Sequence, residues 1–451
     1  MSRRSLICCA VISGVIAAQS HGQVRYSATD LGTLQGGTAN SWGWDLNECG
    51  QVIGYGDAPN NRSLHAFLWS EGEMTDLKTL GGTYSWAYGI NNRTQITGYS
   101  IVDSVTIRGF FWEDGTMEDI GWLPGSRGTF SRGNAINQGG LIVGVCHGTG
   151  DGWIVPYAGF IYDDGAWTEI PTFGGDESQA YGINNAGIAV GWARFAEPEP
   201  TAPRAFAYAN GQLIDIGTFG GTLSKAASIN NLNQVVGVAT DGIGSDRAFV
   251  WEAGVLTDIG DLGGGVSAAN DINDRGQIVG YSDSAEGIKT GFLWQDGVMW
   301  DVNDLVEPGS NVVFHGARAI NELGQIACSG TFEDGTKHAY LLSPVDMMTL
   351  DRPAPGQSGV VNTFTVNNAA PDERVLFAYG MEPGSTGVPG SCDLHVSIAG
   401  PNLVGSAVAD ASGLARLDVL VPNAASGRTL FFQAVQRKAC TGSNLVRFTF
   451  P

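Results

Sequence analysis

An acidic residue recurs at one place in each repeated segment of this chain, and paired carboxylates serve as acid and base in glycosidases. The seven residues are Asp30, Asp76, Asp119, Glu169, Asp215, Asp258 and Asp301. A reaction takes place at one point of a molecule, whereas these carboxylates occur in every repeat. Five basic residues open an aromatic segment of the same repeats and are able to pair with the acids: His65, Arg108, Arg204, Arg247 and His338. We therefore interpret the recurrent acids as architectural.

Metal-binding motifs are missing from the sequence. It holds no His-Glu-x-x-His, no Cys-x-x-Cys and no Asp-x-Asp-x-Asp-Gly pattern. The loop Asp241–Asp246 offers the oxygen ligands that calcium prefers, but an acidic Gly loop is usually only a turn. We expect no cofactor, with calcium as the alternative.

Nucleophile motifs are missing as well. Cys146 and His147 are adjacent, and neighbours on a strand point to opposite faces, so they do not form a thiol–imidazole pair. No Gly-x-Ser-x-Gly elbow opens a helix. The Gly-Gly loops lack the following helix and the Lys of a phosphate cradle. We predict no catalytic residue.

A repeated aromatic segment organises the chain. Ala66-Phe67-Leu68-Trp69 has counterparts in six further places, and the repeats begin at His65, Arg108, Ala158, Arg204, Arg247, Thr290 and His338. The spacings of 43 to 50 residues are those of propeller blades. Because a single repeat cannot cover its own apolar sides, the repeats must pack against one another.

Each repeat predicts four short strands. The aromatic run is apolar on both faces, as expected of a strand between neighbouring sheets. A Gly turn such as Glu71-Gly72 predicts a hairpin to a short acidic strand. A third strand ends in Ile-Asn, as at Ile90-Asn91, where the Asn is able to bond its own backbone and start a turn. The fourth strand, such as Gln95–Tyr99, carries a Gly that indicates close backbone approach.

The two ends of the repeat region complement each other. Tyr26–Leu31 reads as the second strand of a unit that has no first strand, and His338–Leu342 reads as a first strand without a second. Joined, they complete a seventh unit. We therefore predict an all-β protein in which residues 24–345 form a seven-bladed β-propeller, closed by pairing of the N- and C-terminal strands of the repeat region.

These repeats resemble the HAF-repeat family of probable extracellular bacterial proteins. The name describes the run His65-Ala66-Phe67, and Ile272–Gly280 carries the accompanying Ile-Asn, Gly-Gln and Val-Gly elements. The resemblance covers about residues 26–345. It implies an exported repeat protein and no established reaction, so it supplies no site residues.

The tail after Pro344 is built differently. It has more Pro, no Ile-Asn motif and short alternating runs at Val360–Val366, Val375–Tyr379, Cys392–Ile398, Ala415–Val421, Thr429–Val435 and Leu445–Phe450. Such spacing predicts an immunoglobulin-like β-sandwich over residues 346–451. The tail also resembles, more loosely, a C-terminal module of exported bacterial proteins, on Pro389–Cys392 and Cys440–Asn444.

The first residues predict export. Arg3 and Arg4 precede an apolar stretch, Leu6–Ala18, that is too short to span a bilayer, so residues 1–22 read as a signal peptide. A twin-arginine route is the alternative to the ordinary one. In an oxidising compartment Cys392 and Cys440 are expected to form a disulfide, whereas Cys49, Cys146 and Cys328 are expected to be buried apolar residues.

The net charge of −21 disfavours nucleic acid and anionic membrane surfaces as partners. Between the strands, insertions gather in the connections of one face of the predicted ring, where recognition residues usually lie. Our candidate ligand-binding residues there are Trp122, Arg127, Phe130, Arg132, Trp153, Arg194, Phe195 and His315. We predict a secreted, non-catalytic binding or surface protein whose partner is an extracellular protein or polysaccharide. The alternatives are a polysaccharide hydrolase or lyase, which needs non-repeated polar groups converging in the channel or a cleft, and a structural part of the cell envelope.

Overall fold

The computed structural model describes residues 25–34, 40–59, 63–126, 128–149, 156–196, 202–307, 311–345, 348–388, 395–437 and 441–451. In these ranges the chain is almost entirely β, with one short α-helix, α1 (Val302–Leu305), and one 3-10 turn, η1 (Asn423–Ala425). The predicted all-β class is confirmed. No helix in these ranges is long and apolar enough to cross a membrane. The predicted signal peptide, Arg127, Trp153, Cys392 and Cys440 lie outside the described residues.

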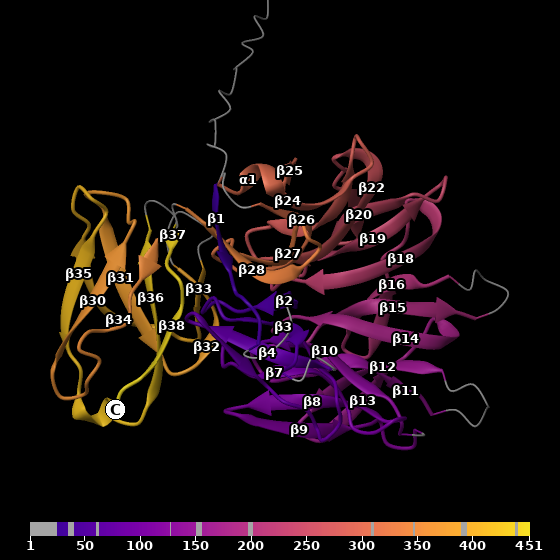
Figure 1. Cartoon of the computed structure of the whole chain (residues 1–451), viewed down its shortest axis with the longest axis horizontal. Helices are drawn as coiled ribbons and strands as arrows, with labels where there is room; N and C mark the ends of the chain where they lie inside the picture. Colours follow the sequence, from indigo (N-terminus) through magenta and orange to yellow (C-terminus); the bar gives the residue numbers. More distant parts are fainter. Residues whose placement is uncertain are drawn as a thin grey trace, which may run out of the picture.

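Strands β1 to β28 pair, within the described residues, into seven antiparallel sheets of four strands (Figure 1). Sheet I holds β2 (Ser41–Leu46), β3 (Val52–Asp57), β4 (Leu64–Ser70) and β5 (Glu73–Asp76). Sheet II holds β6 (Ser85–Ile90), β7 (Ile96–Ile101), β8 (Ile107–Glu113) and β9 (Thr116–Gly121). Sheet III holds β10 (Ser131–Ile136), β11 (Ile142–His147), β12 (Tyr157–Asp163) and β13 (Ala166–Ile170).

The remaining four sheets repeat this order. Sheet IV holds β14 (Gly174–Ile183), β15 (Ala189–Phe195), β16 (Arg204–Ala209) and β17 (Gln212–Asp215). Sheet V holds β18 (Gly220–Ile229), β19 (Val235–Asp241), β20 (Asp246–Glu252) and β21 (Val255–Asp258). Sheet VI holds β22 (Gly263–Ile272), β23 (Ile278–Ser284), β24 (Lys289–Gln295) and β25 (Val298–Asp301). Sheet VII holds β26 (Val312–Ile320), β27 (Ile326–Phe332), β28 (Lys337–Pro344) and β1 (Tyr26–Asp30).

The aromatic strand, which opens each sequence repeat, is the third strand of each sheet, and the strand that ends in Ile-Asn is the first. The central side chain of the aromatic strand fills the space between sheets. In sheets I to VI this side chain is a fully buried Phe: Phe67, Phe110, Phe160, Phe206, Phe249 and Phe292. A strand covered on both faces needs apolar residues in succession rather than in alternation, which explains the Ala-Phe and Gly-Phe pairs of the repeats.

The two ends of the repeat region meet in sheet VII. β1 pairs antiparallel with β28, with Tyr26 opposite Pro344 and Asp30 opposite Tyr340. This confirms the predicted pairing of Tyr26–Leu31 with His338–Leu342. Tyr26 is fully buried in a core with Phe314 and Leu342.

A closed cycle of hydrogen bonds joins the sheets through the Asn that ends each first strand. The side-chain nitrogen of each Asn donates to the backbone oxygen of the Asn in the next sheet, over 2.9–3.2 Å: Asn47 to Asn91, Asn137, Asn184, Asn230, Asn273, Asn321 and back to Asn47. All seven side chains are buried. Each Asn oxygen also accepts the backbone N–H groups two and four residues later, as at Asn91 from Arg93 and Gln95, so the predicted turn role is confirmed.

A second cycle follows one residue further along the chain. The backbone N–H of each residue donates to the side-chain oxygen of its counterpart in the next sheet, in the order Glu48, Asn92, Gln138, Asn185, Asn231, Asp274, Glu322 and back to Glu48. Both cycles close among the described residues, so every one of the seven sheets is bonded to both of its neighbours.

Every first strand carries a β-bulge three residues before its Asn, as between Gly43 and Asp45 in sheet I. The bulge presses the backbone of the first strand against the second strand. A Cβ at Gly54 would lie 1.9 Å from the backbone oxygen of Trp42, and one at Gly98 would lie 1.9 Å from that of Trp86. The close approach predicted from these glycines is therefore confirmed, and the bulge is its cause.

Ion pairs connect the third and fourth strands of five sheets. The predicted partners are all in contact: His65 with Asp76, Arg108 with Asp119, Arg204 with Asp215, Arg247 with Asp258, and His338 with Asp30. Burial favours the neutral form of Asp76, but hydrogen bonds from His65 and Lys78 outweigh it and lower the pKa of that carboxyl to about 2. The recurrent acids act in the architecture, as expected.

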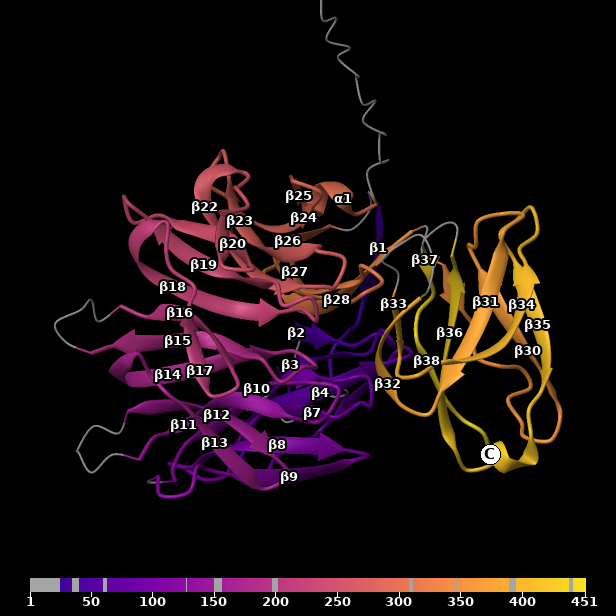
Figure 2. The same cartoon turned by 180° about the vertical axis from the view of Figure 1, so that it is seen from behind.

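The remaining strands belong to the C-terminal region, drawn in orange and yellow beside the seven sheets in both views (Figures 1 and 2). One sheet holds β29 (Thr349–Leu350), β30 (Val361–Asn367) and β35 (Ala415–Leu420), and β32 (Pro383–Gly387) pairs with β33 (His395–Ile398). A larger sheet holds β34 (Asn402–Val408), β31 (Arg374–Gly380), β36 (Thr429–Gln436), β37 (Thr441–Gly442) and β38 (Val446–Thr449). Phe364 of the first sheet shares a core with Phe377 and Phe432 of the larger one.

The C-terminal region contacts the same face of the seven sheets as the Asn turns. The backbone N–H of Leu445 donates to the oxygen of Glu48 over 3.2 Å, and Arg447 donates to Thr94 over 2.9 Å. Arg93 pairs with Glu382 at 2.6 Å. These contacts fall on short turns between strands, and they leave the opposite face, with its variable connections, uncovered by this region.

Pairing of the chain ends predicts a stability effect at Tyr26. Tyr26→Ala removes a buried ring and is expected to lower the free energy of unfolding by about 3 kcal/mol. Tyr26→Phe is expected to be at least as stable as the parent, because the Tyr26 hydroxyl is buried with no hydrogen-bond partner among the described residues. Urea denaturation, with the exposed Ser27→Ala as control, measures both. Equal stability of Tyr26→Ala and Ser27→Ala would contradict the role of β1.

The Asn cycle predicts a second effect. Asn91→Ala removes a buried amide that makes four hydrogen bonds. We expect a loss of about 2 kcal/mol in the free energy of unfolding, because the partner groups stay buried. Thr116→Ala, on the exposed edge strand β9, is the matched control and should change it by less than about 0.5 kcal/mol.

Candidate functional site

A channel runs through the middle of the seven sheets. Its part nearer the Asn cycle is a cavity of about 270 Å³, lined by the first strands of all seven sheets. Its wider part is a cavity of about 420 Å³. The first strands run from the face with variable connections to the Asn turns. Arg132 and Lys225, which stand five residues before Asn137 and Asn230, line only the wider part. The wider part is therefore the mouth that opens on the uncovered face.

The bulges decide which side chains line this channel. A bulge leaves one residue without a pairing partner and redirects its side chain. The seven bulge residues line both cavities: Trp44, Tyr88, Asn134, Tyr181, Ala227, Asn270 and Arg318. The repeated backbone thus presents one position per sheet to the channel, and this position differs in chemistry from sheet to sheet.

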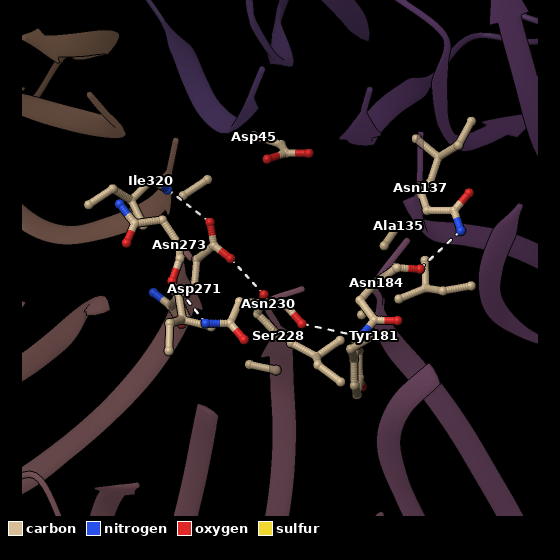
Figure 3. A pocket seen from close by; sticks show the side chains of 18 of the residues that line it. Asp45, Ala135, Asn137, Tyr181, Asn184, Ser228, Asn230, Asp271, Asn273 and Ile320 are labelled. Carbon is tan, nitrogen blue, oxygen red and sulfur yellow. Dashed lines mark hydrogen bonds between the residues drawn. The ribbon is translucent and has the colours of Figure 1, made fainter. Parts of the chain in front are cut away.

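Two carboxyl groups lie at the floor of the channel, next to the Asn cycle (Figure 3). Asp45 accepts the backbone N–H of Leu46 over 2.8 Å and that of Ile90, in the next sheet, over 2.9 Å. Asp271 accepts the hydroxyl of Ser228 over 2.6 Å and the backbone N–H of Ile320 over 2.8 Å. Each carboxyl therefore joins its own sheet to a neighbour.

Burial raises the pKa of both floor carboxyls. The pKa of Asp45 rises to about 7, with a further contribution from the charge of Asp271. That of Asp271 rises to about 6, because burial outweighs its hydrogen bonds. Carboxyls with raised pKa values in a cavity are what an acid–base pair requires. Here all four oxygens already accept hydrogen bonds from the protein, which is a structural use of the two groups.

Acidic groups also crowd the second cycle at this end of the channel. Burial raises the pKa of Glu48 to about 7. Burial and the charges of Glu48 and Asp274 raise the pKa of Glu322 well above its usual value. The floor and the turns around it are therefore the acidic end of the channel.

The mouth has the opposite character. None of the described residues that line the wider cavity is Asp or Glu, whereas Arg132, Lys225 and Arg318 all line it. The guanidinium of Arg318 lies 4.6 Å from the ring centre of Trp44, and that of Arg132 lies 5.6 Å from Tyr88. Lys289 stands 3.4 Å over the ring of Tyr281, another lining residue. The channel therefore changes from basic and aromatic at its mouth to acidic at its floor.

An aromatic cluster holds one wall of the mouth. Trp44 packs edge-on against Tyr88 at 4.7 Å, and Tyr88 stacks on Tyr99 at 5.8 Å. Trp86 stacks on Tyr99 at 4.6 Å and also contacts Tyr55. Rings that pack against one another keep Trp44 and Tyr88 in place without a ligand.

The residues predicted from the variable connections are spread around the uncovered face. Of the predicted residues that the structure describes, only Arg132 lines the channel. Trp122 lies under the guanidinium of Arg108 at 4.0 Å. Phe130 forms a cluster with His147 and Tyr157 at the edge of sheet III.

The others stand further around the ring. Arg194 pairs with Glu177 at 3.0 Å, and Phe195 stacks on Phe173 at 4.7 Å, both in sheet IV. His315 lies within 3.0 Å of the backbone oxygen of Lys289. The structure does not bring these residues into one pocket.

Sequence reasoning missed Trp44, Tyr88, Tyr181, Tyr281, Lys225 and Arg318. A signal for four of them was present in the repeats: Trp44, Tyr88, Tyr181 and Arg318 all stand three residues before the Asn, between positions that are mostly small or aliphatic. A position that varies inside an otherwise regular repeat is the signal by which these channel-lining residues could have been found.

For metals, no group of three or more His, Cys, Asp or Glu in the described ranges has an arrangement that could hold an ion. In the loop proposed for calcium, a carboxylate oxygen of Asp241 accepts the backbone N–H groups of Ile243 and Ser245 and closes a turn.

The cysteines Cys49, Cys146 and Cys328 are free, and the last two are fully buried as expected.

No protein-family model matches the chain, and no curated protein matches it. Among solved structures it is similar to TolB from Acinetobacter baumannii, with 10% identity and a TM-score of 0.38 over 65% of this chain and 63% of that one. It is also similar to the β-propeller domain of the trilobed protease from Pyrococcus furiosus, with 10% identity and a TM-score of 0.41 over 57% and 79% of the two chains. An acylaminoacyl peptidase from Pyrococcus horikoshii has a TM-score of 0.45 at 10% identity, over 74% and 59%. The chain spans less than two thirds of TolB, and such remote similarity does not bear on activity.

The floor carboxyls predict a pH effect on stability. Between about pH 4 and pH 7 the folded chain keeps protons at Asp45 and Asp271 that the unfolded chain has released. The free energy of unfolding should therefore fall by about 4 kcal/mol as the pH rises from 5 to 8. Asp45→Asn should flatten this dependence. Urea denaturation of the parent and the variant across this pH range measures the effect. An equal dependence of stability on pH in the two proteins would contradict the prediction.

Proposed function

We propose that this chain is a secreted, non-catalytic binding protein that presents the uncovered face and the channel mouth to an extracellular protein or polysaccharide. Its scaffold is a seven-bladed β-propeller over residues 24–345, with an immunoglobulin-like sandwich over residues 346–451. The proposal includes a place among exported HAF-repeat proteins, on the resemblance of the repeats. It also includes cleavage of a signal peptide at residues 1–22.

The hydrogen-bond cycles support the scaffold. Seven four-stranded sheets, each bonded to two neighbours through buried Asn side chains, have the connectivity of a closed ring. The shared core of Phe364, Phe377 and Phe432 between two sheets supports a sandwich for the tail.

One observation carries the choice of face. The channel mouth has three cations and four aromatic rings among its lining residues, and it opens on the face that the C-terminal region leaves uncovered. A concave site with a few polar groups on a rigid scaffold is the usual form of a ligand pocket. The insertions that vary between repeats surround the same face.

The floor carboxyls are the observation that favours the second candidate, a polysaccharide hydrolase or lyase. They are non-repeated polar groups in the channel with raised pKa values. Their oxygens, however, are engaged by backbone N–H groups of three sheets and by the hydroxyl of Ser228. We therefore assign them to the scaffold.

Arrays of extracellular polysaccharides and proteins, probed with the chain from residue 23 onward, test the proposal. A binder should show saturable binding and leave a bound polymer at its original length after long incubation. The double variant Trp44→Ala/Trp122→Ala should bind at least about tenfold more weakly, since it removes large rings at the mouth and on the loop face.

The matched control for that variant is Trp300→Ala, on the edge strand β25. Trp300 is 38% exposed and Trp122 is 40% exposed, so a similar ring is lost from a different surface. Binding that is equally weakened by Trp300→Ala would overturn the choice of face. If the chain shortens a polymer and the variant Asp45→Asn/Asp271→Asn does not, the protein is a hydrolase or lyase and the proposal is wrong.

A further inference from the structure

The channel mouth concentrates positive charge on a strongly negative protein. The chain carries 45 acidic residues against 24 Lys and Arg. The described lining of the mouth nevertheless has Arg132, Lys225 and Arg318 and no carboxylate, and Lys289 stands beside it on Tyr281. These cations come from four different sheets.

No ion pair within the described part of the chain involves any of the four cations. By contrast, Arg108, Arg204 and Arg247 of the repeats pair with acids of the fourth strands. Three of them face aromatic rings of the mouth: Arg318 faces Trp44, Arg132 faces Tyr88 and Lys289 faces Tyr281. Lys225 lies 5.5 Å from the ring of Trp192. Burial, together with the charge of Arg318, lowers the pKa of Lys289. Gathered cations without a counter-charge are unfavourable in a partly buried site, and an anionic ligand would relieve this.

The size of the mouth limits the form of the ligand. A cavity of about 420 Å³ walled by strands has room for a narrow polymer or a small molecule. A folded protein surface does not enter such a space. Flat rings at Trp44, Tyr88, Tyr181 and Tyr281 suit ligands that have apolar faces and polar edges, as sugar rings do.

Building on the proposed function, we propose that the mouth binds an acidic polysaccharide, with Arg132 and Arg318 engaging the carboxylates of successive uronate units. A guanidinium presents two parallel N–H donors to a carboxylate, and such charge-assisted pairs are the strong and directional ones. Lys225 and Lys289 add charge around the chain of sugars. The aromatic rings take the apolar faces of the sugar rings.

The acidic floor sets how far such a ligand enters. Asp45 and Asp271 lie beyond the bulge residues, and Glu48 and Glu322 lie in the turns behind them. These carboxyls offer no positive charge to a uronate carboxylate, and the oxygens of Asp45 and Asp271 already accept hydrogen bonds from the protein. An acidic polysaccharide is therefore held at the mouth instead of passing through the channel.

Titration calorimetry of the chain from residue 23 with oligomers of equal length tests this inference. The probes are oligogalacturonate, its carboxyl-reduced form, a neutral glucose oligomer and a sulfated glucose oligomer. Oligogalacturonate should bind, with an affinity that falls as salt rises, and the carboxyl-reduced form should bind at least about tenfold more weakly.

The variant Arg132→Gln/Arg318→Gln should weaken oligogalacturonate binding at least about tenfold, because two charge-assisted pairs are lost. Arg132→Lys/Arg318→Lys keeps the charge and should fall between it and the parent. The matched control, Lys337→Gln/Arg416→Gln, makes the same change in net charge at exposed positions outside the channel and should change affinity less than about twofold. Thermal unfolding confirms that each variant is folded.

The outcomes separate this inference from the proposed function. Equal binding of the neutral and acidic oligomers, or equal losses in the channel and control variants, overturns the acidic ligand and leaves the binding protein standing. Equal binding of sulfated and carboxylated oligomers overturns the carboxylate assignment. If the arrays identify only a protein partner, the acidic polysaccharide is wrong, and if they identify no partner at all, both proposals fail.

Discussion

Seven buried asparagine side chains hold the sheets of this protein in a ring. Each amide uses its oxygen to close the turn at the end of its own first strand and its nitrogen to reach the backbone of the next sheet. Turn formation and sheet association are thus one network, because a buried amide is costly unless both of its ends are bonded. A missing sheet would leave one amide nitrogen and one backbone oxygen without partners. The cycle therefore ties each repeat to the whole ring.

This regular frame allows irregular side chains at its centre. The same bulge occurs in every first strand, and in sheets I to VI the second strand accommodates it with a Gly such as Gly54, where no Cβ would fit. Sheet VII has Cys328 at this position and a second register shift in β26. The bulge residue itself carries no such constraint, because it points into the channel. Trp44, Asn134 and Arg318 occupy equivalent positions with unrelated chemistry. The backbone of the repeat thus supplies equivalent positions, and the departures from the repeat supply the chemical differences between the sheets.

Charge is distributed along the channel in a definite order. Carboxyls next to the Asn cycle, such as Asp45 and Glu48, lie where burial raises their pKa values, and they accept hydrogen bonds that join sheets. Guanidinium and ammonium groups lie at the opposite end, against aromatic rings. The C-terminal region contacts the turns at the acidic end through Leu445 and Arg447, so the basic mouth stays open.

The sequence alone predicts the all-β class, the four strands of each repeat and the pairing of Tyr26–Leu31 with His338–Leu342, because these follow from local periodicity and from a strand missing at each end. It also determined the outer ion pairs, such as Arg247 with Asp258, since both residues recur at fixed places in the repeat. The Asn turns were readable for the same reason. The hydrogen bonds from the Asn side-chain nitrogens to the next sheet could not be predicted, because their partners lie in another repeat.

The gathering of cations and aromatic rings at the channel mouth depends on the tertiary structure. Trp44 and Arg318 are far apart along the chain, and closure of the ring brings Arg318 to within 4.6 Å of the Trp44 ring. The predicted loop residues Trp122, Arg194 and His315 stay apart because each belongs to a different sheet around the rim. Contacts along a strand repeat in the sequence, whereas contacts across a closed ring depend on every sheet taking its place, which no single segment encodes.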